Sequence, residues 1–261
     1  RDTVVGPLTL SGQAVVMYRY EATRPNASAA SAGTLEARAC SASNRLPWAS
    51  VTFAAAQAAC NAAGLRLCRV TRNGSGTVTS DEWGRFCEGA SNRVYPYGNA
   101  YNALACNGND YDPVPGGVNE DLATPTGALA VCQSLDLARD QSGNLAEWVD
   151  DPRVVAGQTV RTVRGGAFDS APTGLTCDDD QRVEPLNYQS SRVGFRCCGL
   201  SCPAGQSTCG NTCVDLAASN TNCGACGATC APGTGCTNGY CCPTGTRACG
   251  DSCVANAQPC P

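Results

Sequence analysis

The stretch D-Q-S-G-N-L-A-E-W, residues 140–148, decides how this chain folds, together with two blocks that follow it. These are V-R-G-G-A-F at residues 163–168 and V-G-F-R-C-C at residues 193–198. A Gly-Gly pair lets two backbones approach closely, and the composition of both later blocks favours strands. The sequence therefore predicts a tight turn through residues 142–144, with strands after residue 160.

The residues around this turn have the chemistry of a cation site. Asp140 and Glu147 carry carboxylates on either side of the turn, and the turn's own carbonyls can point inward. Hard oxygen ligands in a flexible loop suit Ca²⁺. The alternative is a capped turn whose only role is to place Trp148 in the core.

Two helices are expected upstream. Residues 50–64 are rich in alanine, with Ser50 or Thr52 available as N-cap and a glycine to end the helix. A shorter helix is expected over residues 80–89, with Ser80 as its N-cap.

The remaining segments have weaker patterns. The first twenty residues contain short β-favouring runs broken by turns, which predicts strands. Residues 90–140 have little periodicity, and so long a loop needs disulfides or bound metal to hold it. Asp150 and Asp151 are expected to end a strand.

The cysteines divide the chain into two predicted domains, residues 1–200 and 201–261. Nine of the 21 cysteines lie in the first and twelve in the second, a density typical of a small disulfide-rich domain. The tail also contains a repeat, because C-P-A-G-Q-S-T-C-G-N-T-C-V at residues 202–214 recurs as C-P-T-G-T-R-A-C-G-D-S-C-V at residues 242–254. Such a tail requires an oxidising compartment, so a secreted chain with its signal removed is expected.

Charge and composition exclude several classes of function. The formal charge of −4 includes no block of like charges, and no apolar run is long enough to cross a bilayer. Neither nucleic-acid binding nor membrane insertion is therefore expected. Histidine and lysine are both absent, which excludes imidazole acid–base catalysis, His-ligated metals and Schiff-base chemistry.

Residues 1–200 resemble the formylglycine-generating enzyme, or sulfatase-modifying factor, family. The matching blocks, in family order, are Y-R-Y-E-A-T (18–23), V-T-F-A-A-A-Q-A-A-C (51–60), D-E-W (81–83), Y-P-Y-G-N (95–99), S-G-N-L-A-E-W (142–148), R-G-G-A-F (164–168) and G-F-R-C (194–197). The resemblance implies an α+β fold, a variant of the C-type-lectin fold with little regular secondary structure and with loops held by calcium and disulfides.

The resemblance also points to a lost activity. The family's enzymes oxidise a sulfatase cysteine to formylglycine with two cysteines and copper, and the corresponding positions here hold Ser170 and Leu175. A serine hydroxyl does not replace the soft thiolate that Cu(I) requires, so no copper is expected. This member is predicted not to be an enzyme.

The family's stabilising features are retained. The resemblance implies disulfides Cys60–Cys197 and Cys87–Cys177, and elimination adds Cys68–Cys198 and Cys106–Cys132. Because the cysteine total is odd, Cys40 is expected to be free or bonded to another chain. The implied calcium ligands are the side chains of Asp140 and Glu147 with the carbonyls of Gly143 and Leu145. A second calcium site of the family corresponds to Asn107, Gly108 and Asp121.

The tail resembles Stig1-type cysteine-rich repeats of extracellular proteins, through N-C-G-A-C-G at residues 222–227 and its flanking cysteines. Cys223 and Cys226 also match a zinc knuckle. Twelve cysteines without histidine in a secreted chain favour six disulfides, so no zinc is expected.

The sequence thus predicts a secreted, non-catalytic binding or structural protein, of the cell surface or of an extracellular assembly. Its partner would be another extracellular protein, a glycan or a further copy of itself, joined in the last case through Cys40. Two alternatives remain: a formylglycine-generating or other oxygen- or metal-dependent modifying enzyme, and a lectin-like module that binds carbohydrate or peptide. In the latter, Tyr95, Tyr97 and Tyr101 would line the binding surface.

Overall fold

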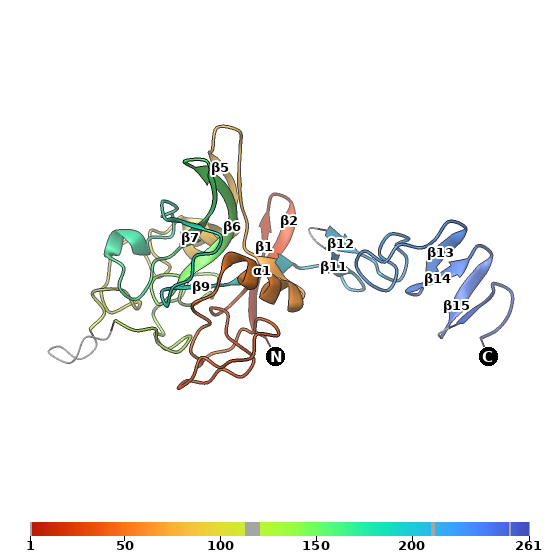
Figure 1. The fold of residues 1–261 in the computed structure, drawn as a ribbon, viewed down its shortest axis with the longest axis horizontal. Coiled ribbons are helices and arrows are strands. Elements are labelled where there is room, and N and C mark those ends of the chain that lie inside the picture. The colour runs from red at the N-terminus through yellow and green to blue at the C-terminus, as the bar shows by residue number, and fades with distance from the viewer. Residues whose placement is uncertain (1, 113–120, 210–211, 251, 261) are drawn as a thin grey trace. The chain divides into compact units, whose positions relative to one another are not determined.

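The computed structural model describes residues 2–112, 121–209, 212–250 and 252–260. The chain divides into two compact units, Arg1–Gly199 and Leu200–Pro261. Strands predominate in both, and the α-helices are few and short (Figure 1). Within the described residues, no helix has the length and apolar character needed to cross a membrane.

The first sheet of the larger unit joins the start of its chain to its end. Its order is β1 (Val4–Leu10), β2 (Gln13–Tyr18), β10 (Cys197–Leu200) and β3 (Arg66–Leu67). The strands expected in the first twenty residues are therefore present, as an antiparallel β1–β2 pair. Because β10 pairs with β3 as well, the G-F-R-C-C block is fixed next to the segment that follows the first helix.

The second sheet carries the block that follows the turn. Its order is β8 (Val183–Pro185), β7 (Gln158–Arg164), β6 (Ala146–Val155) and β9 (Val193–Phe195). Asp150 and Asp151 lie inside β6 and do not end a strand, since β6 continues into a hairpin with β7. A separate hairpin of β4 (Val70–Arg72) and β5 (Val78–Asp81) projects beside the far end of β6 (Figure 1).

Both expected helices form, each shorter than predicted. Helix α1 (Phe53–Ala62) begins after Thr52, whose hydroxyl accepts a hydrogen bond from the Ala55 amide at 3.2 Å. Helix α2 (Glu82–Glu88) is capped by Asp81, so the prediction of Ser80 as its cap was wrong. Ser80 lies in β5, and the Asp81 carboxylate accepts from the Gly84 amide at 2.7 Å. Two 3₁₀ turns complete the helical structure, η1 (Gly89–Ser91) and η2 (Pro172–Leu175).

The core lies between α1 and the two sheets. Trp148 of β6 meets Phe53 of α1 edge to face, with ring centroids 5.9 Å apart. Trp48 meets Phe195 of β9 in the same way at 5.5 Å. Edge-to-face pairs of this kind add to the stabilisation from apolar burial, so the core holds Trp148 of β6 and Phe195 of β9 in place.

The described part of residues 92–145 contains no helix or named strand. The disulfide Cys106–Cys132 closes this loop, and hydrogen bonds between residues 107 and 144 attach it to the turn that precedes β6. Long irregular loops in compact domains usually need such fixed points.

The described residues of the smaller unit form three β-hairpins with loops between them. They are β11 (Ser207–Cys209) with β12 (Thr212–Val214), β13 (Thr234–Thr237) with β14 (Tyr240–Pro243), and β15 (Thr246–Cys249) with β16 (Ser252–Ala255). Six disulfides hold these hairpins: Cys202–Cys213, Cys209–Cys226, Cys223–Cys236, Cys230–Cys241, Cys242–Cys253 and Cys249–Cys260. The two copies of the sequence repeat have the same disulfide between cysteines eleven positions apart, Cys202–Cys213 in the first copy and Cys242–Cys253 in the second.

Candidate functional site

The turn through residues 140–147 can form only because of its glycine. Gly143 has φ +71°, and a Cβ at this position would lie 2.0 Å from the carbonyl oxygen of Asn107. The Gly143 amide donates to the Gly165 carbonyl at 2.8 Å, and the Asn144 amide donates to the Asn107 carbonyl at 2.7 Å. The turn is therefore packed between the Gly-Gly pair and the long loop.

Behind this turn lies a buried charge cluster, made of Glu21, Asp140, Glu147 and Arg196. All four residues are buried, with at most 5 % of their surface exposed. Three carboxylates share one guanidinium, so the fully ionised cluster would carry two excess negative charges. Excess charge in a low-dielectric interior is costly unless a cation or a proton neutralises it.

Arg196 uses all five of its N–H donors. Its Nη2 donates to Glu147 Oε1 at 2.8 Å, and its Nε donates to Glu147 Oε2 at 3.0 Å. The other donors meet the carbonyls of Tyr18, Arg19 and Arg139 at 2.6 to 3.0 Å. A buried guanidinium with every donor satisfied fixes the strands around it.

Glu147 is thereby occupied by the protein itself. Besides Arg196, its Oε2 accepts a hydrogen bond from the Trp83 indole at 2.7 Å. The carboxylate predicted to bind calcium therefore has hydrogen-bond partners on both oxygens. As the structure stands, Glu147 fits Arg196 better than it fits a metal ion.

The negative charges of Asp140 and Glu21 are less well compensated than that of Glu147. Burial raises the pKa of Asp140 to about 6, although the Gly127 amide, which donates to Oδ2 at 2.6 Å, and Arg196 both oppose this. Burial, and next the negative charge of Asp140, raise the pKa of Glu21 well above its ordinary value. Glu21 accepts hydrogen bonds from the Leu145 amide at 2.9 Å and the Asn144 side chain at 2.5 Å.

The remaining predicted ligands are carbonyls of the turn. No hydrogen bond between described residues ends on the carbonyl oxygen of Gly143 or of Leu145. Together with the Asp140 carboxylate they are hard oxygen donors of the kind that bind Ca²⁺, whereas the Glu147 carboxylate is already bonded to Arg196 and Trp83.

The residues of the second predicted calcium site have structural partners. Asn107 is 3 % exposed, and its Nδ2 donates to the Leu122 carbonyl at 2.9 Å and to Asn144 Oδ1 at 3.0 Å. The Gly108 carbonyl accepts from the Tyr111 amide at 2.9 Å. Asp121 is half-buried at the edge of the described region. Asn107 thus joins the long loop to the turn.

Ser170 and Leu175, the positions expected to correspond to the family's two cysteines, lie close together around Gly108 and Gly166. Leu175 is 2 % exposed. A Cβ added to Gly108 would lie 2.5 Å from its Cδ1, and one added to Gly166 would lie 2.9 Å from its Cδ2. Ser170 Oγ accepts a hydrogen bond from the Ala167 amide at 2.8 Å. The leucine side chain thus occupies the space between the two glycines.

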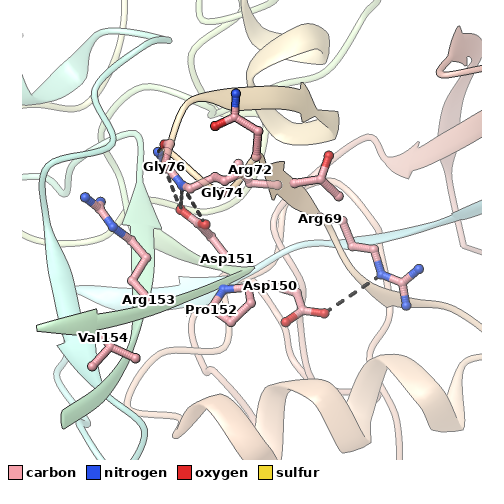
Figure 2. A pocket seen from close by; sticks show the side chains of 12 residues that line it. Arg69, Arg72, Gly74, Gly76, Asp150, Asp151, Pro152, Arg153 and Val154 are labelled. Atoms are coloured by element: carbon pink, nitrogen blue, oxygen red, sulfur yellow. Dashed lines mark hydrogen bonds and ion pairs between the residues drawn. The ribbon is translucent and has the colours of Figure 1, made fainter. Parts of the chain in front are cut away.

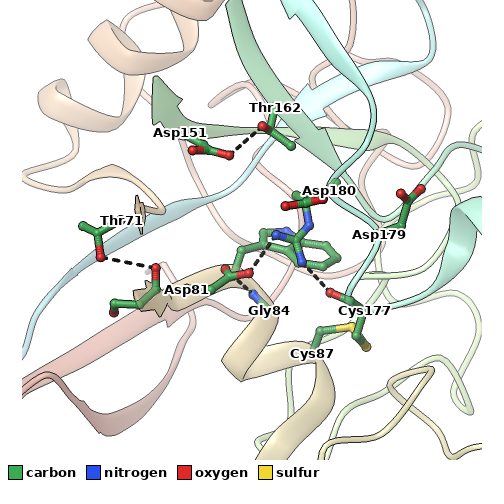
Figure 3. Close-up of polar contacts among 12 residues, drawn as sticks. Thr71, Asp81, Gly84, Cys87, Asp151, Thr162, Cys177, Asp179 and Asp180 are labelled. Carbon is green, nitrogen blue, oxygen red and sulfur yellow. Dashed lines mark hydrogen bonds and ion pairs between the residues drawn. A yellow bond between two sulfur atoms is a disulfide. The ribbon is translucent and has the colours of Figure 1, made fainter. Parts of the chain in front are cut away.

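The larger unit contains four disulfides, which join the cysteine pairs expected from the resemblance and by elimination. They are Cys60–Cys197, Cys68–Cys198, Cys87–Cys177 and Cys106–Cys132. Cys177, next to the filled position, is thus bonded to Cys87 of α2 (Figure 3). All 21 cysteines fall in the described residues, and only Cys40 is free.

Two members of the charge cluster were not predicted as site residues. Glu21 and Arg196 both lie in blocks used for the resemblance, Y-R-Y-E-A-T and G-F-R-C. A charged residue amid an apolar block was the available signal, because such a residue is rarely buried without a partner. Their partners lie far away along the chain, because Leu145 is 124 positions from Glu21 and Glu147 is 49 positions from Arg196.

The three tyrosines of the lectin-like alternative do gather. Tyr95 and Tyr97 stack with centroids 5.4 Å apart and an interplanar angle of 7°, and Tyr101 lies 5.7 Å from Tyr95. Their hydroxyls are engaged by Pro172, Asn102 and Asp110, which fits loop packing. Tyr95 itself is only 7 % exposed.

Comparison with known proteins gives a family match and several distant structures. The family model of the sulfatase-modifying factor enzyme 1-like domain matches residues 13–199. No curated protein matches the chain. Among the solved structures similar at low identity, one titled crystal structure of CarF has 16 % identity over 71 % of this chain and 86 % of the other, with a TM-score of 0.48. Treponema denticola variable protein 1 has 14 % identity over 71 % of this chain and 84 % of the other, with a TM-score of 0.46. PvdO from Pseudomonas aeruginosa has 15 % identity over 70 % of this chain and 79 % of the other, with a TM-score of 0.47.

Proposed function

The chain belongs to the family of sulfatase-modifying factor enzyme 1-like domains, and on this premise we propose that it is a non-catalytic member. We infer a secreted binding or structural protein, of the cell surface or of an extracellular assembly. Residues 1–200 would supply a C-type-lectin-like variant as the scaffold. Residues 201–261, a Stig1-like tail, would act as a cross-linked spacer or adhesive module.

The packing of Leu175 carries the proposal. Its side chain lies against Gly108 and Gly166, where the resemblance places one of two reactive cysteines. The other position holds Ser170, and Cys177 nearby is tied to Cys87. Cu(I) needs soft sulfur ligands, and this location offers a hydroxyl, a methyl-bearing side chain and a disulfide.

An oxidation assay tests the lack of catalysis. The purified chain would be loaded with Cu(I) and incubated with a peptide that carries a sulfatase cysteine motif, while oxygen uptake and peptide mass are followed. A two-cysteine formylglycine-generating enzyme serves as the positive control. We expect no copper-dependent uptake and no aldehyde, and either one would overturn the proposal.

We also propose one calcium ion at the turn. The excess negative charge of the cluster, the raised pKa of Asp140 and the free carbonyls of Gly143 and Leu145 support it. Bound calcium would supply charge neutralisation and loop rigidity. Glu147 would take part only if it gave up part of its contact with Arg196. The second site, at Asn107, Gly108 and Asp121, is retained only as a proposal of lower occupancy.

Extracellular placement rests on the disulfides. Twenty of the 21 cysteines are bonded, a pattern that persists in oxidising compartments. The proposed partners are another extracellular protein, a glycan or another copy of the chain, with neither nucleic acid nor membrane insertion involved.

A further inference from the structure

A cleft outside the charge cluster lies between two strand edges. One wall is formed by residues 69–74 and 76 of the β4–β5 hairpin, and the other by residues 150–154 of β6 (Figure 2). We call this cleft the β4–β6 slot. It encloses about 740 Å³, within the range of ligand sites in proteins.

The slot exists because Pro152 stops a parallel pairing. Strand β6 meets the start of β4 at a parallel bridge between Arg69 and Asp150, where the Asp150 amide donates to the Cys68 carbonyl at 2.8 Å. The next backbone N–H of β6 that would point toward β4 belongs to residue 152, but this residue is a proline and has no N–H. The two strands therefore part after one bridge.

Beyond Pro152, β6 presents an unused edge. The β6–β7 hairpin closes on the pair Val155–Gln158, around the two-residue turn Ala156–Gly157, in which both residues have positive φ. The pair that flanks such a turn is hydrogen-bonded, and hydrogen bonding then alternates along the strand. The N–H and C=O of Val154 consequently point away from β7. Strand β9 pairs with β6 only along Ala146–Trp148, so among the described strands none covers this edge.

The charges of the slot favour an anion. Three arginines (Arg69, Arg72, Arg153) and two aspartates (Asp150, Asp151) line it. Both aspartates are already paired: Asp151 with Arg72 at 2.7 Å, and Asp150 with Arg161 at 3.5 Å and Arg69 at 3.8 Å. Arg72 also pairs with Asp180 at 2.6 Å, so the three lining arginines and Arg161 meet three aspartates, and one positive charge is in excess. Figure 2 shows the Arg72–Asp151 contact between the two walls.

Arg153 has positive charge to spare. Its Nη1 donates to the backbone carbonyl of Asp180 at 2.7 Å, and no carboxylate of the described residues lies within ion-pair distance of it. Arg69 has only the long ion pair with Asp150, at 3.8 Å, and burial and the neighbouring Arg66 lower the pKa of its guanidinium. An acidic ligand would meet both groups.

We propose that the β4–β6 slot binds an extended, acidic segment of a partner protein by strand addition to the edge of β6. Main-chain bonds to Val154 would set its register, and carboxylates at alternate positions would meet Arg153 and Arg69. The Val154 side chain, 73 % exposed, offers an apolar contact beside them. The arginines repel a basic strand and attract a carboxylate-bearing one, so they select for an acidic segment. The proposal rests on the binding role given above and names its partner class.

The test uses the full chain and a defined probe. The probe is the fluorescein-labelled peptide Thr-Glu-Val-Glu-Val-Glu-Thr, and its control carries lysine in place of each glutamate. Fluorescence anisotropy should show binding of the acidic peptide, at least about tenfold weaker binding of the control, and weakening with salt. No acidic-peptide binding, or equal binding of both peptides, would overturn the proposal.

Variants separate the slot from other surfaces. Arg153→Gln breaks no ion pair of the described residues and should weaken binding about tenfold. Arg192→Gln removes the same charge from an exposed pair with Asp169 and should leave affinity unchanged. Val154→Pro removes the outward donor together with the valine side chain and should abolish binding, whereas Val154→Ala removes only the side chain and should retain it, with the circular dichroism spectrum unchanged in both. Equal effects of Arg153→Gln and Arg192→Gln would contradict the site.

Two further outcomes remain informative. If free glutamate displaces the labelled peptide as strongly as the unlabelled peptide does, the slot is an anion site and strand addition is wrong. If sedimentation shows dimers that Val154→Pro dissolves, and no peptide binds, the occupant is a second copy and the acidic-partner assignment fails. Copper-dependent oxidation together with intact peptide binding would refute the non-catalytic role and leave the slot standing.

Discussion

Arg196 and Glu147 form an ion pair in which the Nη2–Oε1 distance is 2.8 Å and neither side chain is more than 1 % exposed. The pair links the residue between β9 and β10 to the second residue of β6. Since the guanidinium also holds three carbonyls, the strands on both sides depend on it.

The first prediction concerns this pair. Arg196→Lys cannot supply five donors in a planar arrangement, so the free energy of unfolding should fall by roughly 3–5 kcal/mol. Urea denaturation measures it. Arg192→Lys, in an exposed pair with Asp169, is the matched control and should cost under about 1 kcal/mol. Similar losses in the two variants would show that the buried pair is not central to the fold.

The second prediction is a pH dependence. Asp140 has a pKa of about 6 in the folded chain against 3.8 ordinarily, so the folded state binds the proton more tightly. Without calcium, stability relative to Asp140→Asn should therefore be highest below pH 4 and fall as the pH rises to 7, by about 3 kcal/mol. Thermal unfolding in EDTA follows this difference across the pH range.

Calcium should reverse that trend. Bound metal needs the ionised carboxylate, so 5 mM calcium should raise the unfolding temperature of the wild type at pH 7 and leave Asp140→Asn unchanged. A flat stability difference in EDTA would contradict the burial of an uncompensated charge. Equal calcium effects on both proteins would place the ion elsewhere.

The third prediction compares the disulfides that close a long loop with one that closes a short loop. Cys60–Cys197 and Cys68–Cys198 close nearly the same loop, with separations of 137 and 130, whereas Cys106–Cys132 closes one of 26. Because either long-range bond alone keeps the long loop closed, loop-closure entropy predicts a loss of at least roughly 5 kcal/mol for the variant with serine at all four long-range cysteines, and roughly 3.5 kcal/mol for the double serine variant of Cys106–Cys132. Urea denaturation of both variants gives the order. A larger loss for the short loop would mean that native packing outweighs chain entropy here.

The fourth prediction concerns Cys40. It is the single free cysteine, and it is half-buried. A thiol reagent should titrate one thiol per chain in urea, react more slowly with the folded protein, and find none in Cys40→Ser. A count of zero in the wild type, with a dimer band on non-reducing electrophoresis that Cys40→Ser removes, would instead place Cys40 in an intermolecular bond.

Local patterns were sufficient for elements whose causes lie within a few residues. The alanine-rich run with Thr52 forms α1, and the first β-favouring runs form β1 and β2. The second helix was placed correctly but its cap was not. Ser80 and Asp81 are both good caps in isolation, and the pairing of Ser80 with Thr71 in the β4–β5 hairpin decides between them.

Longer-range features escaped sequence reasoning because their partners are far apart along the chain. Asp151, expected at a strand end, is fully buried and paired with Arg72, 79 positions away. Glu147, expected to bind metal, is satisfied by Arg196. Residue type and spacing identify oxygen-bearing side chains, but only folding shows which of them a neighbouring guanidinium already occupies.

By itself, the sequence determined the family, the division of its cysteines, and the glycines that allow the turn at Gly143, because these depend on residue identity and on short-range backbone geometry. Tertiary structure alone decided that Leu175 fills the space between two glycines, that Arg196 neutralises Glu147, and that Pro152 opens a slot beside β6. Each of these brings together segments that are far apart in the chain, such as Leu175 with Gly108 and Arg196 with Glu147. Packing and charge compensation, which no local pattern records, determine the outcome there.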